Sequence, residues 1–594
     1  MHARRSSSLV FSEEQLRRVW QWEVSSGHYP SMRTIPREIG IVSSLPNPAR
    51  MKQRMYMDPQ PRDRDRLHVP PRPVPGSIAD LDAILRECDF ETDQYVRDCL
   101  EYLRVASGLD DLPGRTSEQV DAWRYAFIEA QQPATESAAL FIDQTSPSRA
   151  FKLRPGPLEK ALDLPAVVSR SNDVDLPAGS CDPAYPRIFH MFWAGPFTDK
   201  PYMAILSYLY TQNTGLDRLF GASNNTILVC RPKFWIWIAT GQPSGSVTNI
   251  TAALADNPWS EPFLHPRFKD VIEFREWDTT AQLDSIPELR NDWRQFQDAL
   301  INSGGYIVNA ESRKKQDYDK PSVLLSNLAR WVLCHRFGGI YIDADTIFLR
   351  DWEELWGWRG AFAYRWSFHD KFNSAVLRMH AGSAIGSFIF RTALRNGLDF
   401  HPMKVSKYLQ DGQLDRLLFR CPDALFDPGF LTAEKYQMDR PPSPEFNEFG
   451  HFFEAPLRHS AAPQVVGFDG FFRGAWSYHW HSFWKASFDA VSDWPELGPR
   501  FIDGESRQRR RLLMQRTQSL KSETQKEKAA RSRMAKAAQN TAHTSQAGLE
   551  DMDPHRDLSW STVLKRTFEA YVRGERPSMY GEWLVWPDEQ PKAR

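Results

Sequence analysis

The stretch from Ser326 to Trp352 constrains the fold more than any other part of this chain, and it reads SNLARWVLCHRFGGIYIDADTIFLRDW. Gly338 and Gly339 can end a helix by adopting positive φ, and Ile340–Ile342 then favour a strand. Together the helix, the glycine turn and the apolar strand are typical of an α/β fold. Before the glycines, apolar residues recur at the three- and four-residue spacing of a buried helical stripe; they are Leu325, Leu328, Ala329, Val332 and Leu333.

Two carboxylates, Asp343 and Asp345, follow the predicted strand one residue apart. Residues i and i+2 of a strand share a face, so the pair would lie together at the carboxyl end of the strand. Open α/β sheets bind ligands at that end. A paired carboxylate suits a hard divalent cation such as Mg²⁺ or Mn²⁺, shared with the phosphates of a substrate. The pattern therefore predicts a metal and diphosphate site, and an exposed Asp-Ala-Asp turn is the alternative.

Asn327 and Arg330 lie one helical turn apart on the second side of the same helix. They are polar groups within a mostly apolar segment, so each needs a partner there.

These residues resemble the DXD sugar-binding region of family 32 glycosyltransferases, the group that includes yeast α-1,6-mannosyltransferases and animal α-1,4-galactosyltransferases. With Arg330 set on the arginine of the motif, the matching positions follow without a gap; they are Gly338, Gly339, Tyr341, Asp343 and Asp345. Asn327 departs from the pattern, because the family usually has Asp there. An amide can still bind a sugar or ribose hydroxyl, but it adds no charge.

The resemblance implies a GT-A type fold, with a Rossmann-like, mainly parallel sheet, and a UDP- or GDP-hexose donor. It implies that Asp345 binds Mn²⁺ or Mg²⁺ directly and that Asp343 contacts the metal and the sugar or ribose. Both aspartates are then the catalytic candidates. Asn327, Arg330 and Tyr341 become candidates for binding the donor.

Two further segments match the family. The apolar run Ile188–Trp193 resembles its first strand, and Trp193 matches the aromatic residue that stacks on the base in related enzymes; a core tryptophan is the alternative. The segment Trp476–Trp484 resembles the closing H-H-W-x-x-x-W pattern, with His479, Trp480 and Trp484 on matching positions. Imidazole is a sound metal ligand beside carboxylates. His479 is therefore the predicted third metal ligand, and His481 is the alternative.

The composition excludes some classes of protein. The 594 residues carry a formal net charge of -1, which excludes a uniformly basic nucleic-acid binder. The six cysteines include no C-x-x-C pair, so disulfides are permitted but a zinc motif is not predicted. No apolar run approaches the roughly 18 residues of a membrane span. The resemblance implies a Golgi enzyme of the secretory pathway, so membrane association is expected only if an anchor is missing from this sequence.

Changes of pattern along the chain predict five regions. Residues 1–76 are an N-terminal extension with a Pro/Arg-rich linker, and its helix begins at the capping box Ser12-Glu13-Glu14-Gln15. Residues 77–180 are helical, and residues 181–500 form the GT-A domain. Residues 501–548 are a basic flexible linker, and residues 549–594 are an amphipathic segment that packs back on that domain. Within the domain we expect a helix over 386–394 and further strands over 226–229, 271–274, 361–366 and 374–377.

The sequence as a whole predicts a metal-dependent glycosyltransferase that moves a hexose from a nucleotide-sugar to a hydroxyl of a glycan, glycolipid or glycoprotein, with retention. A non-catalytic binding protein on the same fold is the first alternative. A haloacid dehalogenase-type phosphatase is the second, because Ile340 to Ile347 also fits a strand followed by D-x-D-x-T. In such a phosphatase Asp343 would be the nucleophile and Asp345 the general acid. That class also needs a G-D-x-x-x-D motif, which is not found, so the phosphatase ranks lowest.

Overall fold

The structure is a computed structural model. It describes residues 11–29, 31, 33, 35–43, 72–73, 79, 81–82, 140–142, 162–164, 181–195, 197–217, 230–239, 250–296, 319–365, 371–427, 475–479, 560–574 and 577–584.

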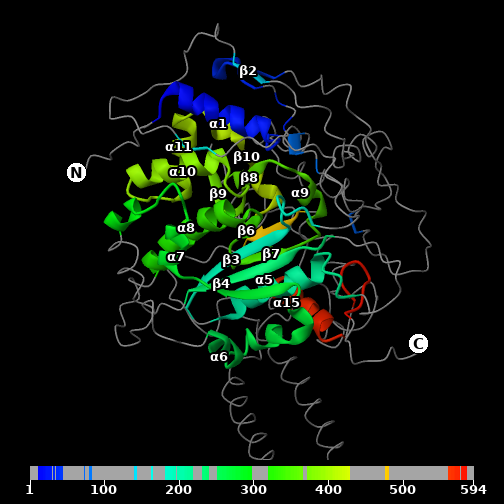
Figure 1. Cartoon of the computed structure of the whole chain (residues 1–594). Helices are drawn as coiled ribbons and strands as arrows, with labels where there is room; N and C mark the ends of the chain where they lie inside the picture. Colours follow the sequence, from blue (N-terminus) through cyan, green and yellow to red (C-terminus); the bar gives the residue numbers. More distant parts are fainter. Residues whose placement is uncertain are drawn as a thin grey trace, which may run out of the picture.

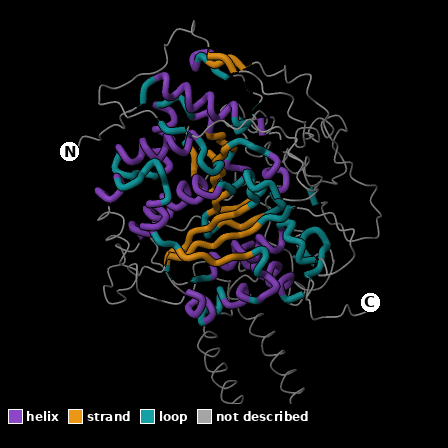
Figure 2. The backbone as a smooth tube through the Cα atoms, in the orientation of Figure 1, coloured by secondary structure: helices purple, strands orange, loops and turns teal. Residues whose placement is uncertain are grey.

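A seven-stranded sheet with strand order β10-β8-β9-β6-β3-β4-β5 forms the centre of the molecule (Figure 2). β9 is antiparallel to both of its neighbours, while the other neighbouring strands are parallel. The prediction of an α/β fold with a mainly parallel sheet is therefore confirmed, and the arrangement is consistent with a Rossmann-like fold. The strands are β3 (Ile188–Ala194), β4 (Lys233–Ala239), β5 (Ile272–Glu276), β6 (Ile340–Ile342), β8 (Ala361–Arg365), β9 (Phe372–Arg378) and β10 (Leu418–Cys421).

The strands expected around 188, 271, 361 and 374 correspond to β3, β5, β8 and β9. The strand expected over 226–229 lies outside the described residues. β4 was not predicted, because it has apolar residues on both of its faces and so lacks the alternation of a half-buried strand. Phe234 and Ile236 join one hydrophobic core, while Trp235 packs on the other.

Helices cover both faces of the sheet (Figure 1). α5 (Asp199–Thr211) and α15 (Trp560–Val572) lie on one face, where Met203 and Leu206 share a core with Phe189. The other face carries α8 (Asp319–Phe337), α10 (Ala384–Arg395), α11 (Pro402–Asp411) and α1 (Glu13–Ser25). β6 contributes to both cores, because Ile340 and Ile342 face the first and Tyr341 faces the second. The short elements are α6 (Ile250–Ala255), α7 (Thr279–Asp284), α9 (Glu353–Gly357), β1 (Ile41–Ser43) and β2 (Leu140–Ile142).

A second, two-stranded sheet brings the distant segment around residue 479 to the end of β6. β7 (Thr346–Phe348) pairs antiparallel with β11 (Ser477–His479), and Thr346 lies opposite His479. The segment before β11 is held by backbone bonds from Leu349 N to the carbonyl of Trp476 (3.0 Å) and from Trp476 N to the carbonyl of Leu425 (2.8 Å).

Both ends of the described chain pack on this core. α1 begins at the predicted capping box, with Gln15 N donating to Ser12 Oγ (3.3 Å) and Ser12 N donating to Gln15 Oε1 (3.2 Å). α15 packs against α5 through the Tyr210–Phe568 ring pair, whose centroids lie 5.0 Å apart. Part of the predicted amphipathic segment, Trp560–Val572, is therefore a helix that packs on α5.

A disulfide joins Cys181 to Cys230, while Cys334 and Cys421 are buried free thiols. Cys88 and Cys99 lie outside the described residues. Among the residues that the structure describes, no helix combines the length and the apolar character that crossing a membrane requires.

Candidate metal centre

Asp343 and Asp345 lie in a tight turn between β6 and β7. Asp343 N donates to the carbonyl of Ala375 on β9 (2.8 Å), and Thr346 N donates back to the carbonyl of Asp343 (3.0 Å). The second bond closes a four-residue β-turn. The expectation that the pair continues an extended strand was therefore wrong. The turn, and not strand alternation, brings the two carboxylates together.

The double glycine sets where β6 begins. Gly338 N donates to the carbonyl of Cys334 (2.8 Å) and ends α8, and both glycines have positive φ, 68° and 86°. A Cβ on Gly339 would lie 2.3 Å from the carbonyl oxygen of Ile188. Only glycine allows β6 to start this close to β3. The positive φ of both glycines at the end of the helix was predicted, whereas the contact with Ile188 was not.

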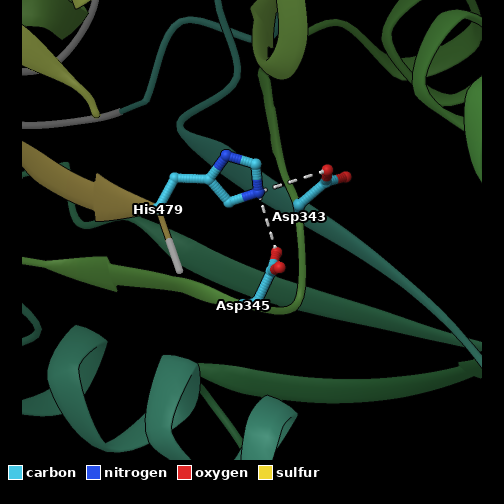
Figure 3. A group of neighbouring side chains, drawn as sticks. All are labelled: Asp343, Asp345 and His479. Atoms are coloured by element: carbon cyan, nitrogen blue, oxygen red, sulfur yellow. Dashed lines mark ion pairs between the residues drawn. The ribbon is translucent and has the colours of Figure 1, made fainter. Parts of the chain in front are cut away.

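The His479 ring completes a group with the two aspartates (Figure 3). Its Nε2 lies 3.0 Å from Asp345 Oδ1 and 3.8 Å from Asp343 Oδ2. His479 is 6% exposed and Asp345 is 7% exposed, so little water reaches the ring. The structure thus brings together the three residues that the sequence predicts as metal ligands. His481, Trp480 and Trp484 lie outside the described residues.

The spacing of these atoms suits one divalent ion. An octahedral ion with bonds of about 2.1 Å separates neighbouring ligand atoms by about 3 Å and opposite ones by about 4.2 Å. One ligand atom from each of Asp343, Asp345 and His479 lies within 4.8 Å of the other two. Two carboxylates and one imidazole are therefore a suitable ligand set for one divalent metal ion and leave positions for other oxygen ligands.

Two residues that were not predicted lie behind His479. Tyr364 Oη is 2.9 Å from His479 Nδ1, and Asp427 Oδ2 is 3.7 Å from the same nitrogen. Tyr364 also donates to Asp427 Oδ2 (3.2 Å). Tyr364 lies in the predicted strand over 361–366, but nothing local distinguishes it from a core tyrosine. No motif surrounds Asp427.

Arg330 reaches the site from α8, as its place beside the predicted motif implies. Its guanidinium donates to Asp343 Oδ2 (2.7 Å) and to Ser374 Oγ (3.0 Å) and lies 5.7 Å from the centre of the Tyr341 ring. Tyr341 Oη lies 3.4 Å from Ser326 Oγ. The partner of Arg330 is therefore one of the two paired aspartates, so this arginine positions a candidate ligand. Its contact with a donor remains a prediction.

The charges at the site favour a cation. Three carboxylates face one guanidinium and one imidazole. Burial raises the pKa of Asp343 above its ordinary value, although Arg330 opposes the shift. Burial alone would lower the pKa of His479, but Asp345 and Asp427 outweigh it and raise this pKa well above its ordinary value. A cation beside Nε2, either a proton or a divalent metal ion, reduces this excess of negative charge.

The other predicted residues are buried. Asn327 is 5% exposed, and its side chain makes no hydrogen bond to the described part of the chain. Trp193 is 8% exposed at the carboxyl end of β3, in the core that α5 covers. Burial suits a core tryptophan as well as one that stacks on a base. The donor-binding roles of Asn327 and Trp193 therefore remain predictions.

No protein-family model matches the chain, and no curated protein sequence matches it. Among solved structures, the chain is similar to one described as "PaToxG Glycosyltransferase", at 14% sequence identity over 43% of this chain and 76% of the other. The TM-score is 0.25, and a similarity this weak carries no argument about the site.

Proposed function

We propose that this protein is a metal-dependent glycosyltransferase that moves a hexose from a UDP- or GDP-sugar to a hydroxyl of a glycan, glycolipid or glycoprotein, with retention. One observation supports this proposal above the others. Asp343, Asp345 and His479 converge at the carboxyl end of β6, in a mostly parallel sheet. Ligands of open α/β sheets bind at this end.

In this proposal Asp343, Asp345 and His479 would hold Mn²⁺ or Mg²⁺, which would supply positive charge for the leaving diphosphate. Arg330 fixes the orientation of Asp343 through its 2.7 Å bond. The side chain of Asn327, buried without a hydrogen-bond partner in the described chain, is available for a hydroxyl of the donor. Trp193 is the candidate for stacking on the base.

Family 32 membership, the GT-A fold and the domain over residues 181–500 belong to the same proposal. So does a secretory-pathway location such as the Golgi. The Cys181–Cys230 disulfide supports an oxidising compartment, because disulfides persist there and are rare in the cytosol.

The test is to titrate the full chain with Mn²⁺ and Mg²⁺ and then to screen UDP- and GDP-hexoses for metal-dependent binding and hydrolysis. Asp345→Asn should lose metal binding and donor turnover together while keeping its thermal midpoint. Asp284→Asn is the matched control, because Asp284 is an exposed aspartate in α7 that pairs with Arg294. This control should bind metal like the wild type.

Asp343→Asn is a less clean variant, because it leaves Arg330 buried without its counter-charge. Breaking a buried ion pair costs about 3–5 kcal/mol. If the wild-type chain binds metal and donor but turns over no sugar, a non-catalytic binding protein replaces the enzyme. If it binds no divalent metal, the proposed function is wrong.

A further inference from the structure

A short chain of polar groups extends from the side of the His479 ring that faces away from the carboxylates. Tyr364 Oη lies 2.9 Å from Nδ1 and also 3.2 Å from Asp427 Oδ2. Tyr364 and Asp427 are each 1% exposed, so water does not compete for these contacts. The two residues come from separate parts of the fold, β8 and the segment after β10.

The direction of these hydrogen bonds follows from the number of protons. A tyrosine hydroxyl has one proton, and the Asp427 carboxylate can only accept it. A tyrosine hydroxyl ordinarily has a pKa of about 10, so it keeps its proton at neutral pH. Tyr364 Oη, having donated to Asp427, has only lone pairs left for the imidazole. With Tyr364 donating to Asp427, Nδ1 of His479 carries a hydrogen and donates it to Tyr364.

When His479 is neutral, a hydrogen on Nδ1 leaves Nε2 with its lone pair. Nε2 is the atom that faces Asp345 and Asp343, at 3.0 and 3.8 Å (Figure 3). In metal sites, the second nitrogen of a histidine ligand usually donates to a carboxylate, a carbonyl or water in this way, which fixes the tautomer and the ring orientation.

Asp427 and Tyr364 are themselves held in place. The Phe426 ring stacks on Tyr364 and on Trp476, with centroids 6.2 and 5.9 Å apart. Ser477 Oγ donates to the carbonyl of Phe426 (2.9 Å), which ties β11 to the segment that bears Asp427. The segment that supplies His479 and the segment that supplies its carboxylate partner are thus joined directly.

We propose that Tyr364 and Asp427 are positioning residues that keep the hydrogen on Nδ1 of His479, so that Nε2 is the nitrogen that binds a divalent cation, in place of a proton, together with Asp343 and Asp345. The inference rests on the proposed function only in so far as the site binds a metal. It does not depend on the identity of the sugar or of the acceptor.

The test measures the affinity for Mn²⁺ alone, following free Mn²⁺ by electron paramagnetic resonance. Tyr364→Phe and Asp427→Asn should each weaken Mn²⁺ binding about 10- to 100-fold, the usual effect of removing such a partner of a ligand histidine. The double variant should lose little more than either single variant, because both residues act through the same hydrogen bond. Tyr208→Phe is the matched control, since it removes a buried hydroxyl that donates to the carbonyl of Pro232 (2.7 Å) instead.

The possible outcomes separate this inference from the proposed function. If the wild-type chain binds no Mn²⁺, both are wrong. If the wild type binds Mn²⁺ and Tyr364→Phe binds it equally well, only the positioning role is overturned. A Tyr208→Phe protein that loses the same affinity as Tyr364→Phe would overturn it too, because the loss would then be structural.

A second measurement determines the tautomer in the unmodified chain and uses a variant only to assign the signal. Long-range nitrogen–proton spectra of histidine-labelled protein with Zn²⁺ distinguish the two tautomers, and the spectrum of His479→Gln identifies the signal of His479. The hydrogen should be on Nδ1. A hydrogen on Nε2 would overturn the proposal.

Discussion

His190 shows how one buried side chain supports the glycine turn that precedes the site. Its Nε2–H donates to the carbonyl of Gly338 (2.8 Å), and its Nδ1 accepts from Trp237 Nε1 (3.3 Å). A neutral ring satisfies both partners, whereas a protonated ring would place a second donor opposite the indole N–H. Burial lowers the pKa of His190 from 6.5 to about 3.

This pKa predicts a loss of stability in acid. The folded protein excludes a proton that the unfolded chain binds below about pH 6.5, so His190 costs no stability above that pH. Below that pH the free energy of unfolding falls by up to about 1.4 kcal/mol per pH unit, down to about pH 3. Urea unfolding between about pH 7 and pH 4 should show a shallower pH dependence for His190→Gln than for the wild type. Equal slopes would contradict the prediction.

At the scale of the elements, the step from α8 to β6 depends on the space available at Gly339. Its φ of 86° and the carbonyl of Ile188 leave no room for a side chain. β6 has only three residues, and it pairs with β3 through Phe189 and His190. A shift at its first residue therefore moves the following turn with Asp343 and Asp345.

Gly339→Ala is expected to destabilise the protein and to weaken Mn²⁺ binding. Gly382→Ala is the matched control, because Gly382 also has positive φ, 63°, but a Cβ added there would meet no atom within 4 Å. The control should lose only the backbone term, about 1–2 kcal/mol. Gly339→Ala should lose about 1–3 kcal/mol more from the clash. Guanidinium unfolding measures the loss of stability in each variant. Equal losses in Gly339→Ala and Gly382→Ala would show that the contact with Ile188 is unimportant.

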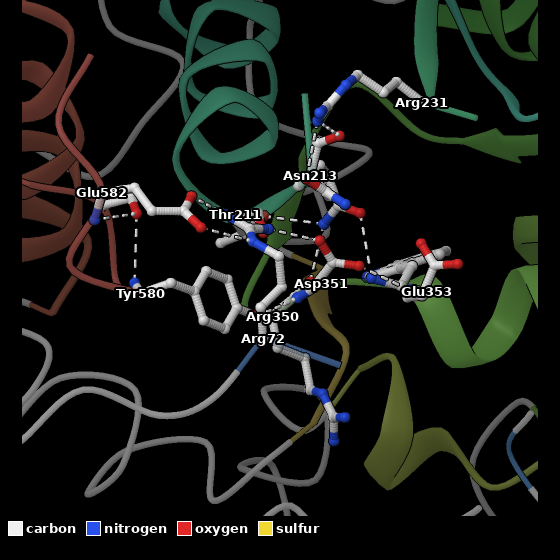
Figure 4. A network of polar contacts seen from close by, with 12 residues as sticks. Arg72, Thr211, Asn213, Arg231, Arg350, Asp351, Glu353, Tyr580 and Glu582 are labelled. Carbon is white, nitrogen blue, oxygen red and sulfur yellow. Dashed lines mark hydrogen bonds and ion pairs between the residues drawn. The ribbon is translucent and has the colours of Figure 1, made fainter. Parts of the chain in front are cut away.

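At the scale of the whole molecule, Arg72 joins three parts of the chain that are far apart in sequence (Figure 4). Its guanidinium contacts Asp351 Oδ2 (2.6 Å), Glu582 Oε2 (2.5 Å) and the carbonyl of Thr211 (2.9 Å). Tyr580 covers its flat face at 4.0 Å and accepts a bond from Asp351 N (2.7 Å). The N-terminal region, the segment after β7 and the C-terminal region are thus linked through one cation.

Removing this cation should destabilise the folded chain as a whole. The Asp351 side chain is 3% exposed, and Arg72→Ala would leave its charge without this partner, at a cost of about 3–5 kcal/mol. Lys407→Ala is the control, because the Lys407 and Asp411 side chains are 38% and 31% exposed and such an exposed ion pair is worth about 0–1 kcal/mol. Thermal unfolding and proteolysis of the C-terminal region measure how much more Arg72→Ala destabilises the protein than the control variant does. Similar midpoints for the two variants would contradict the linking role.

The sequence by itself determined the local elements: the helix that ends at two glycines, the short strand after it, the neighbouring aspartates and the capped helix at Ser12. Each follows from contacts between residues a few positions apart, and such contacts leave a readable period or motif. The turn at Asp343–Thr346 was only the alternative prediction, because D-x-D suits a strand as well as a turn.

Only the tertiary structure decided which distant groups meet at the site. His479 reaches the aspartates because β11 pairs with β7, and a local motif could suggest this residue but not its distance from Asp345. Tyr364 and Asp427 had no signal at all, since nothing near them in sequence differs from ordinary core and loop residues. Their meeting depends on the packing of two cores against both faces of one sheet, which is a property of the whole chain and of no single segment.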